Sequence, residues 1–340
     1  MSKLYDVAVV GATGLVGETV LSILEQREFP VASLYLLASE RSVGQKIMYD
    51  GKNLSVENIQ DFDFSQAQIA LFCAGGSISE TYAPIAADSG CVVVDNSSFF
   101  RNEFDVPLVV PEVNPDSIIN YSARNIIANP NCSTIQMMLA LAPIHREVGI
   151  EKINVSTYQA VSGSGKAGLE ELAKQTTSLL NAREIQTDIY SQQIAFNVLP
   201  HIDVFMDNDY TREEMKMVWE THKILEDDTI AVNATCVRVP VFHGHSESVH
   251  IETANYISAA EVRELLASAA GVEVVDAPAQ QEYASAVVHA SGADAVFVSR
   301  IREDLSDNNG INLWVVSDNG RKGAALNAVQ IAELLIEKYL

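Results

Sequence analysis

Short apolar runs and stretches of helical periodicity alternate over the first hundred residues. A valine-rich run at 5–10 is followed by a glycine-punctuated turn at 11–17, and the apolar spacing of 18–26 is helical. Further apolar runs of strand length occupy 33–39, 68–74 and 91–98. Regular alternation of strands with helices predicts an α/β fold with a doubly wound, mostly parallel sheet.

The pattern changes from about Glu151, where apolar and polar residues alternate with a period of two. Runs such as 152–160, 235–242 and 247–257 predict strands of a mixed sheet with one covered face. The apolar spacing of the last twenty residues is helical. We therefore expect a Rossmann-type domain over 1–130, completed by a helix at 320–340, and an α+β domain over 131–319. An active site is expected between them.

Composition and charge exclude several classes of protein. The 340 residues are 48% hydrophobic and 20% charged, which is typical of an ordinary globular chain. The formal net charge of -23 should repel nucleic acid and anionic membrane surfaces, so neither is an expected partner. A site for an anionic substrate must gather cations against that field. Each Arg or Lys within a motif is therefore a stronger candidate for binding such a substrate.

The cysteines and the start of the chain indicate a cytoplasmic protein. The four cysteines, at 73, 91, 132 and 236, show neither the close pairs of a zinc site nor the density of a disulfide scaffold. No metal site is expected. The first residues enter a strand directly, without the pattern of a signal peptide, and no apolar run has the length of a membrane span.

The glycine-punctuated turn indicates a dinucleotide-binding site. Glycines at 11, 14 and 17 let the backbone approach a pyrophosphate, and the following helix offers its N-terminal N–H groups. An acidic residue usually ends the second strand of NAD enzymes. Here Arg41 stands between Ser39 and Ser42, which favours the 2′-phosphate of NADP, although Glu40 leaves NAD open.

Cys132 follows Asn-Pro-Asn and directly precedes a run of helical periodicity. A helix N-terminus favours a thiolate, and its N–H groups could stabilise an oxyanion, although a lone cysteine is more often a core residue. Arg238 and His245 are separated by Pro240 and Gly244, so a turn could bring them to one cleft. His243 and His250 compete for the acid–base role, and a structural role for all three histidines stays open.

Seven segments together resemble aspartate-β-semialdehyde dehydrogenase. They are GATGLVG, VVVDNSSFFR, VPLVVPEVN, NPNCST, STYQAVSGSG, RVPVFHGHSES and WVVSDNGRKGAALNAVQIAE. Their order and spacing match the family from the first strand to the last helix. The resemblance implies NADPH-dependent reduction of L-aspartyl-4-phosphate to L-aspartate 4-semialdehyde and phosphate. This reaction lies at the branch point toward lysine, methionine and threonine.

The resemblance also assigns roles to individual residues. Cys132 is the nucleophile that forms a thioester, Gln159 orients the acyl group and His245 is the acid–base residue. Arg238 would hold the substrate α-carboxylate. Arg101, Asn131 and Lys216 correspond to phosphate-binding positions, and Glu213 to a contact for the α-amino group. Without the family, Glu213 and Lys216 would be an exposed ion pair on one helix face.

Cofactor contacts and assembly follow from the same resemblance. The implied cofactor contacts are Gly11, Thr13, Gly14, Leu15, Val16, Ser39, Arg41, Ser42, Ser162, Gly163 and Asn319. The resemblance makes 131–319 the catalytic and dimerisation domain, because the family forms homodimers through its second domain. Two alternatives remain: an N-acetyl-glutamyl-phosphate reductase, for which Glu213 would lose its purpose, and a non-catalytic dinucleotide-binding relative, which the complete set of catalytic positions disfavours.

Overall fold

A computed structural model describes residues 3–340 and divides the chain into two compact units. The first unit runs to Pro130 and also contains Ala324–Leu340, whereas the second is Asn131–Gly323. Residues 320–323 therefore belong to the second unit.

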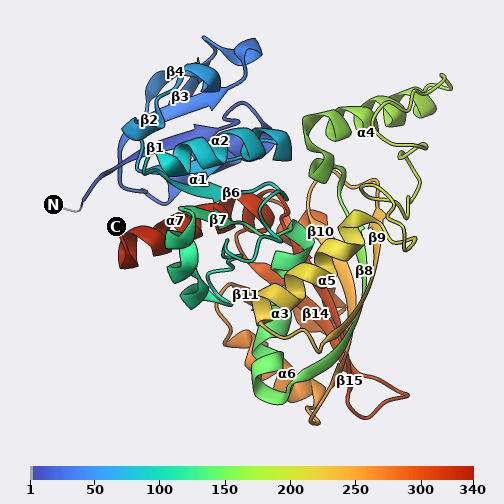
Figure 1. Ribbon diagram of the computed structural model, residues 1–340. Helices are drawn as coiled ribbons and strands as arrows, with labels where there is room; N and C mark the ends of the chain where they lie inside the picture. The colour runs from blue at the N-terminus through green and yellow to red at the C-terminus, as the bar shows by residue number, and fades with distance from the viewer. Residues whose placement is uncertain (1–2) are drawn as a thin grey trace. The chain divides into compact units, whose positions relative to one another are not determined.

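The first unit is built on a seven-stranded sheet with the order β3-β4-β2-β1-β5-β6-β7. Its elements are β1 Tyr5–Val10, α1 Leu15–Gln26, β2 Val31–Ala38, β3 Lys46–Tyr49, β4 Lys52–Asn58, β5 Ile69–Phe72, α2 Gly76–Asp88, β6 Val92–Asp95, β7 Ile126–Ala128 and α7 Leu326–Lys338. All its pairings are parallel except β3–β4. The predicted doubly wound sheet is confirmed (Figure 1).

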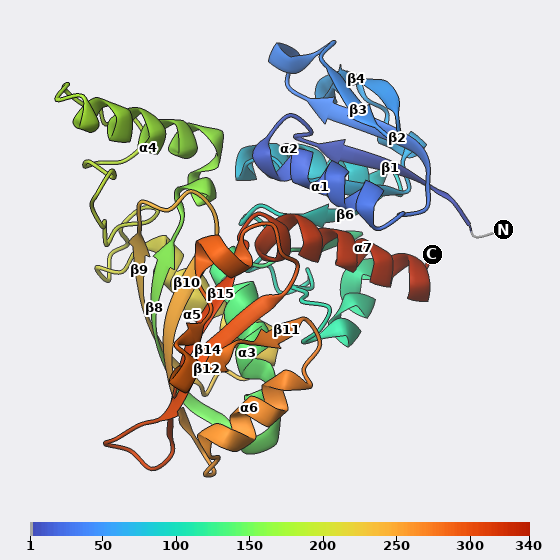
Figure 2. The same cartoon turned by 180° about the vertical axis from the view of Figure 1, so that it is seen from behind.

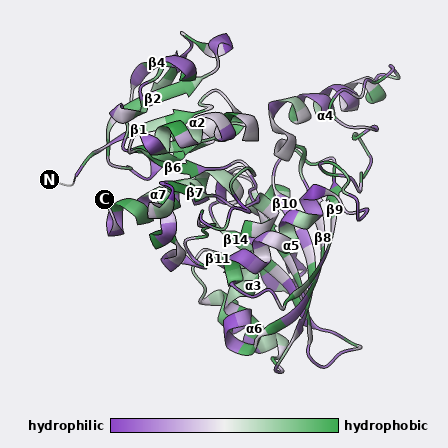
Figure 3. Cartoon of the chain, viewed as in Figure 1, coloured by the Kyte–Doolittle hydropathy of each residue, from purple (hydrophilic) through white to green (hydrophobic). Residues whose placement is uncertain are grey.

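The central strands of this sheet are buried along almost their whole length. Every residue of β5 and β6 is buried, as a parallel sheet with helices on its faces requires. Strand β6, which is labelled in Figure 3, is mainly coloured as hydrophobic. The closing helix α7 packs against α1, β5 and β6, so the last residues of the chain complete the core that the first residues begin.

The second unit holds a six-stranded mixed sheet with the order β11-β14-β15-β10-β8-β9. Its elements are α3 Cys132–Val148, β8 Ile150–Gln159, α4 Gly165–Leu180, α5 Arg212–Leu225, β9 Ala231–Arg238, β10 His245–Thr253, α6 Ala259–Ala267, β11 Val272–Val274, β12 Asp276–Ala277, β13 Glu282–Tyr283, β14 Val296–Glu303 and β15 Gly310–Ser317. Figures 1 and 2 show this sheet from opposite sides.

One face of the mixed sheet is covered by helices, as the period-two pattern predicts. Helix α3 packs against β8, β10, β14 and β15, and α5 packs against β9. Along β10, residues 245, 247, 249, 251 and 253 are buried, and from 248 onward the residues between them are only partly buried. Residues 133–142 and 144 of α3 are buried and only its last turn reaches the surface, so it is mainly a core helix.

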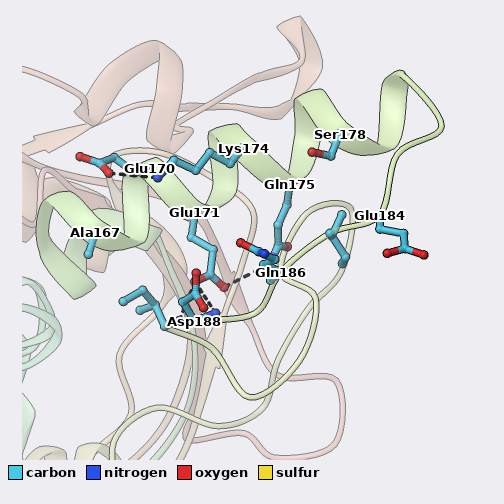
Figure 4. Close-up of a pocket in the computed structure, with 11 residues that line it drawn as sticks. Ala167, Glu170, Glu171, Lys174, Gln175, Ser178, Glu184, Gln186 and Asp188 are labelled. Carbon is cyan, nitrogen blue, oxygen red and sulfur yellow. Dashed lines mark hydrogen bonds and ion pairs between the residues drawn. The ribbon is translucent and has the colours of Figure 1, made fainter.

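A pocket lies between α4 and the segment 184–189, and residues that line it hydrogen-bond to one another. The buried carboxylate of Glu171 accepts hydrogen bonds from the backbone N–H group of Asp188 at 3.0 Å and from Gln175 Nε2 at 3.1 Å (Figure 4). It also accepts from the backbone N–H group of Tyr190 at 3.4 Å. These bonds anchor the irregular segment that follows α4. The carboxylate is thus occupied in holding the chain.

Residues 3–340 contain neither a candidate membrane-spanning helix nor a cluster of metal-ligating side chains. None of the helices there has both the length and the apolar composition needed to cross a bilayer. Within the same residues, His, Cys, Asp and Glu side chains form no group of three or more that could hold a metal ion.

Candidate active site

Cys132 is the first residue of α3, and its side chain is partly exposed. Asn131 caps the helix: its Oδ1 accepts from the backbone N–H groups of Ser133 at 2.9 Å and Thr134 at 3.4 Å. These two N–H groups are therefore engaged in capping the helix. The thiol still lies at the positive end of the helix dipole.

Glycine at 323 makes room for the thiol. A Cβ placed on Gly323 would lie 2.8 Å from Cβ of Cys132, closer than such atoms approach in real structures. The backbone of Gly323 therefore packs directly on the cysteine. This contact explains a glycine in the segment that precedes the last helix.

The other three cysteines are unsuited to nucleophilic chemistry. Burial raises the pKa of Cys91 to about 12, and it also raises the pKa values of Cys73 and Cys236 above the ordinary range. A thiol that stays protonated at neutral pH is a poor nucleophile. Cys91 and Cys236 are buried, and Cys73 is partly buried and packs against the core.

The strand ends β8, β9 and β10 bring three further site residues to the covered face. Gln159 ends β8 and is paired in register with Arg238, which ends β9, while His245 begins β10. All three side chains are buried. Arg238 and His245 are thus joined through the intervening strand β8, not by the single turn that their spacing suggested.

Ala160 fixes both of the outer residues through its backbone. Its N–H donates to His245 Nδ1 at 3.0 Å, and its carbonyl accepts from Arg238 Nη1 at 2.7 Å. A Cβ on Gly163 would lie 2.7 Å from Arg238 Nη1 and 3.4 Å from His245 Nε2, so both side chains lie under that glycine. No sequence pattern indicates Ala160, because both of its hydrogen bonds are made by the backbone.

His245 is an uncharged imidazole with a defined tautomer. Burial, together with the nearby Arg238 guanidinium, lowers the pKa of His245 to about 3, against the opposing effect of Glu213. Because Nδ1 accepts the Ala160 N–H, the proton of the neutral ring lies on Nε2. The two competing histidines lie elsewhere: His250 is on the opposite face of β10 and contacts Asp304 at 2.7 Å, and His243 precedes the strand.

Glu213 on α5 connects the cysteine to the strand ends. Its Oε1 accepts from Asn131 Nδ2 at 2.9 Å and from Gln159 Nε2 at 3.3 Å, and its Oε2 accepts from Lys216 Nζ at 2.9 Å. The Lys216 ammonium also contacts Asp203 at 2.8 Å. The pair is therefore on one helix face, as predicted, but its interpretation as an exposed ion pair is wrong because Glu213 is buried.

The charge state of Glu213 follows from these neighbours. Burial alone would raise its pKa, but the Lys216 ammonium, with the Lys216 and Asn131 hydrogen bonds, outweighs burial and holds the pKa at about 2. The pKa of Lys216 is raised: burial lowers it, but the carboxylates of Glu213 and Asp203 more than compensate. The site thus contains a permanent anion beside a permanent cation.

Two residues of this network had a weaker sequence signal or none. Glu220 lies seven residues after Glu213 on the same helix face and accepts the Asn131 N–H at 2.6 Å. Helical spacing could have identified it. Asp203 lies in an irregular segment, and nothing in its local pattern indicates contact with Lys216.

The remaining expected contacts of this unit surround the loop after β8. Ser162 donates through Oγ to Asn319 Oδ1 at 3.0 Å, and the Gly244 N–H donates to the same oxygen at 3.0 Å. Asn319 therefore holds the loop that contains Ser162 and Gly163 next to the start of β10. These three residues lie close to His245 in the fold.

The first unit contains the glycine-rich turn between β1 and α1. Gly11 has φ of +80°, and a Cβ there would lie 2.9 Å from the Cys73 carbonyl oxygen. A Cβ on Gly17 would lie 2.2 Å from the Gly11 carbonyl oxygen, so only glycine fits both positions. The N-cap of α1 is Gly14, which has no side chain to satisfy the first N–H groups. This bare helix start, followed by Leu15 and Val16, suits a pyrophosphate.

The end of β2 brings a second set of expected cofactor residues to that turn. Glu40–Ser42 form a short 3₁₀ turn directly after the strand, with Ser39 preceding it. Ser42 Oγ lies 3.3 Å from Thr13 Oγ1, so this turn meets the glycine-rich one. Arg41 is exposed, as a group that binds a phosphate from solvent would be.

Arg101 belongs to the same unit and is buried. Its Nη2 donates to the Asn96 carbonyl at 2.8 Å. Asp95, at the end of β6, shapes this loop by accepting from Ser79 Oγ at 2.6 Å and from Ser97 Oγ at 2.7 Å. The Asp95 contribution was not anticipated from sequence.

Comparison with known proteins agrees with these features. The semialdehyde dehydrogenase NAD binding domain family matches residues 6–121, and the semialdehyde dehydrogenase dimerisation domain family matches residues 141–322. Aspartate-semialdehyde dehydrogenase 2 of Vibrio cholerae serotype O1 is 59% identical over the full length of both chains.

Solved structures give the same result. Crystalline aspartate semialdehyde dehydrogenase II of Vibrio cholerae in complex with ASA is 58% identical, with a TM-score of 0.98 over 100% of both chains. Aspartate semialdehyde dehydrogenase from Candida albicans with NADP is 25% identical, with a TM-score of 0.77 over 98% of both chains. This chain belongs to the aspartate-semialdehyde dehydrogenase family.

Proposed function

We propose that this chain reduces L-aspartyl-4-phosphate to L-aspartate 4-semialdehyde and phosphate with NADPH, through a thioester on Cys132. The supporting observation is the hydrogen-bonded chain that starts beside the cysteine. It runs from Asn131 through Glu213 to Gln159, whose partner in register is Arg238. In the cell this reaction would supply the synthesis of lysine, methionine and threonine.

Cys132 starts the reaction as a thiolate. Its sulfur attacks the acyl-phosphate carbonyl, the carbon–oxygen bond to phosphate breaks, and a thioester forms. A bound nicotinamide dinucleotide supplies the hydride that reduces the thioester. The carbon–sulfur bond then breaks, which releases the aldehyde and restores the thiolate.

His245 acts on the oxygen that gains charge during reduction. Its Nε2 proton can donate a hydrogen bond to that oxygen, because Nδ1 is already occupied by the Ala160 N–H. As an imidazolium, His245 would protonate this oxygen and take the proton back when the aldehyde forms, while the proton that the net reaction consumes leaves with the phosphate. An anionic substrate held against Arg238 would offset the positive charge that helps to lower the pKa of this ring.

Different charged residues would bind different groups of the substrate. Arg238 would bind the α-carboxylate with two parallel hydrogen bonds. Glu213 stays ionised at neutral pH and is therefore an acceptor for the α-ammonium group. Lys216, Asn131 and Arg101 would bind the phosphate. A carboxylate for the amine favours this substrate over one whose amine is blocked.

NADP is the cofactor that the first unit fits best. Gly11, Gly14 and the start of α1 would hold the pyrophosphate, and Thr13, Ser39 and Ser42 would hold the adenosine ribose. Arg41 would pair with the 2′-phosphate, since no acidic residue ends β2. Ser162, Gly163 and Asn319 would contact the nicotinamide end.

A homodimer is the proposed assembly. The second unit matches a dimerisation domain family, and the face of its sheet away from α3 carries aromatic side chains. Tyr158 and Trp314 lie there with ring centroids 5.5 Å apart, and Tyr158 is exposed in the single chain. Sedimentation equilibrium tests the assembly: we expect a dimer mass for the wild type and a monomer mass for Trp314→Glu. The same mass for the two proteins would contradict this interface.

One steady-state experiment tests the proposed activity. NADPH formation is followed with aspartate semialdehyde, with and without phosphate, and with N-acetylglutamate semialdehyde in parallel. We expect phosphate-dependent turnover of the first aldehyde only. Turnover of the acetylated aldehyde would instead support an N-acetyl-glutamyl-phosphate reductase, and absence of turnover with both would support a non-catalytic relative.

A further inference from the structure

Glu247 is a buried acid that the proposed reaction does not use. It is the third residue of β10, on the same face as His245, and its side chain has 0% exposure. In register it lies opposite Thr157 on β8 and Val315 on β15. Neither of its carboxyl oxygens has a hydrogen-bond partner among residues 3–340. A buried acid in this position requires a physical explanation.

The side chain that faces this acid is Gln136 of α3. Gln136 follows Cys132 by four residues, one helical turn further into the core, and it is also fully buried. Its amide nitrogen and oxygen have no partner of normal hydrogen-bond geometry in the described part of the chain. Two complementary polar groups therefore face each other directly below the cysteine.

Only one charge state of Glu247 can satisfy both groups. An ionised carboxylate only accepts hydrogen bonds, which would leave the Gln136 oxygen without a donor. An uncharged carboxylic acid donates its O–H to that oxygen and accepts from the amide NH₂, so the two groups can form a closed pair. A small approach of the first turns of α3 to β10 would complete it.

We propose that Glu247, as an uncharged carboxylic acid paired with Gln136, is a positioning residue that fixes Cys132 above the strand face carrying His245. Cys132 and Gln136 lie on one face of α3, and His245 and Glu247 lie on one face of β10. The pair therefore ties the two elements together one layer below the reacting groups. This inference rests on the proposed role of Cys132 as the nucleophile.

The surrounding charges favour the uncharged state. His245 lies on the same strand face as Glu247, and Cys236 on β9 lies within electrostatic range of Glu247 as well as of Glu213 and Glu214 on α5. The residues in register with Glu247, Thr157 of β8 and Val315 of β15, are not titratable in the neutral range. Burial raises the pKa of Glu247 well above its ordinary value, and the facing Gln136 amide opposes this only in part. A second buried anion near Glu213 would also disfavour a thiolate.

Two variants with one matched control test the positioning role. Glu247→Gln keeps an uncharged group that can pair with Gln136, whereas Glu247→Met removes the pairing at similar volume. Val249→Ala shortens the next buried side chain on the same strand face, so it perturbs the core without touching the pair. Each protein is assayed for kcat, KM and the pH dependence of Cys132 alkylation.

We expect Glu247→Gln to keep kcat within about twofold of the wild type, because its amide can still pair with Gln136. For Glu247→Met we expect kcat to fall by about tenfold to a hundredfold with KM nearly unchanged, since small displacements of a reacting group have effects of this size. The alkylation midpoint should shift in that variant. Val249→Ala should lower the melting temperature while leaving kcat and the alkylation midpoint unchanged.

The charge state is tested without any activity measurement. In the unfolded chain Glu247 loses its proton above its ordinary pKa of 4.5, whereas in the folded chain its raised pKa keeps it protonated. Wild-type stability should therefore fall relative to that of Glu247→Gln as pH rises from 4.5 to 8, by up to about tenfold per pH unit in the unfolding equilibrium constant. A constant difference over this range would overturn the uncharged state.

The outcomes separate this inference from the proposed function. If Cys132→Ala retains turnover, the nucleophile is wrong and the proposed function fails. If Cys132 proves essential while Glu247→Met has wild-type kcat and alkylation behaviour, the positioning role alone is overturned. Equal damage in Glu247→Gln and Glu247→Met would likewise overturn it. Should Glu247→Met fail to fold, Glu247→Gln and the pH dependence of stability decide.

Discussion

The backbone N–H of Ala160 donates a hydrogen bond of 3.0 Å to Nδ1 of His245. The carbonyl of the same residue accepts from Arg238 at 2.7 Å. One residue, with a methyl side chain, therefore orients both the proposed acid and the proposed carboxylate-binding group. The backbone is the stiffest part of a strand end, so the two side chains are held at fixed positions relative to each other.

The neutral state of His245 predicts a pH dependence of stability. In the unfolded chain His245 is protonated below its ordinary pKa of 6.5. In the folded chain burial lowers its pKa to about 3. The stability that neutral His245 contributes to the fold is complete above pH 6.5 and is lost as the pH falls toward 3. In His245→Asn, the unfolding free energy should fall less steeply between pH 6.5 and 5, by up to about 1.4 kcal/mol per pH unit.

Urea unfolding of both proteins at several pH values measures this slope. The range stops at pH 5 because Glu213 begins to contribute below 4.5, where its own protonation in the unfolded chain destabilises the fold. Parallel curves for wild type and variant between pH 6.5 and 5 would show that His245 is not buried in the neutral state.

Replacing the proposed nucleophile should remove turnover and leave the cofactor site intact. Cys132→Ala is expected to lose all measurable activity because no other cysteine has an accessible thiolate. NADP binding, followed by fluorescence titration, should be retained. The matched control is Cys91→Ala, which changes a buried cysteine of the other unit and should keep full activity. Residual turnover in Cys132→Ala would contradict the thioester.

The close approach of Gly323 to the cysteine gives a second test of its position. In Gly323→Ala the new methyl would lie 2.8 Å from Cys132 Cβ, so one of the two must move. We expect kcat to fall by about tenfold or more because the sulfur is displaced. The rate of Cys132 alkylation by iodoacetamide should change with it. A wild-type alkylation rate together with wild-type kcat would show that the contact has no functional role.

Arg238 should require a guanidinium and not only a positive charge. Arg238→Lys keeps the charge but loses the bidentate geometry and the bond to Ala160, at a cost of about 1–3 kcal/mol in productive binding. This corresponds to a fall in kcat/KM for aspartate semialdehyde of about 5- to 150-fold. Arg183→Lys, an exposed arginine of the same unit, serves as the control. Equal kinetics for the two variants would remove Arg238 from the substrate site.

Cofactor preference should depend on Arg41. Arg41→Ala is expected to raise KM for NADP by about tenfold to a hundredfold, because an exposed charge-assisted pair with the 2′-phosphate is lost. KM for NAD should change little. Glu40→Ala alters the neighbouring exposed side chain of the same turn and is the matched control. If both variants change the two KM values alike, Arg41 does not read the 2′-phosphate.

Much of the parallel sheet could be predicted because its signals are local. The runs that became β1, β5 and β6 are continuous apolar stretches of strand length, and the glycines after β1 are required by close backbone contacts. The antiparallel pair β3–β4 was not predicted. Its turn has Asp50 and Gly51 at positive φ, which is the Asp-Gly signal of a tight hairpin, but its strands are mostly polar and lack an apolar run.

The interactions of the site residues depend on contacts that have no local pattern. The partners Asn131 and Glu213 lie 82 residues apart in sequence, and Ala160 and His245 lie 85 residues apart. A spacing of three places Glu213 and Lys216 on one helix face whether they are exposed or buried. The spacing therefore could not decide whether they form an exposed ion pair or a buried hydrogen-bonded network.

The sequence by itself determined the two kinds of sheet, the glycine-rich turn and the residue types of the site, because hydrophobic periodicity and glycine conformation act over a few residues. Only the tertiary structure decided the tautomer and charge of His245, the ionisation of Glu213 and the facing of Glu247 and Gln136. Protonation depends on burial and on neighbours supplied by distant strands and helices, and those neighbours come together only when the sheet register is formed.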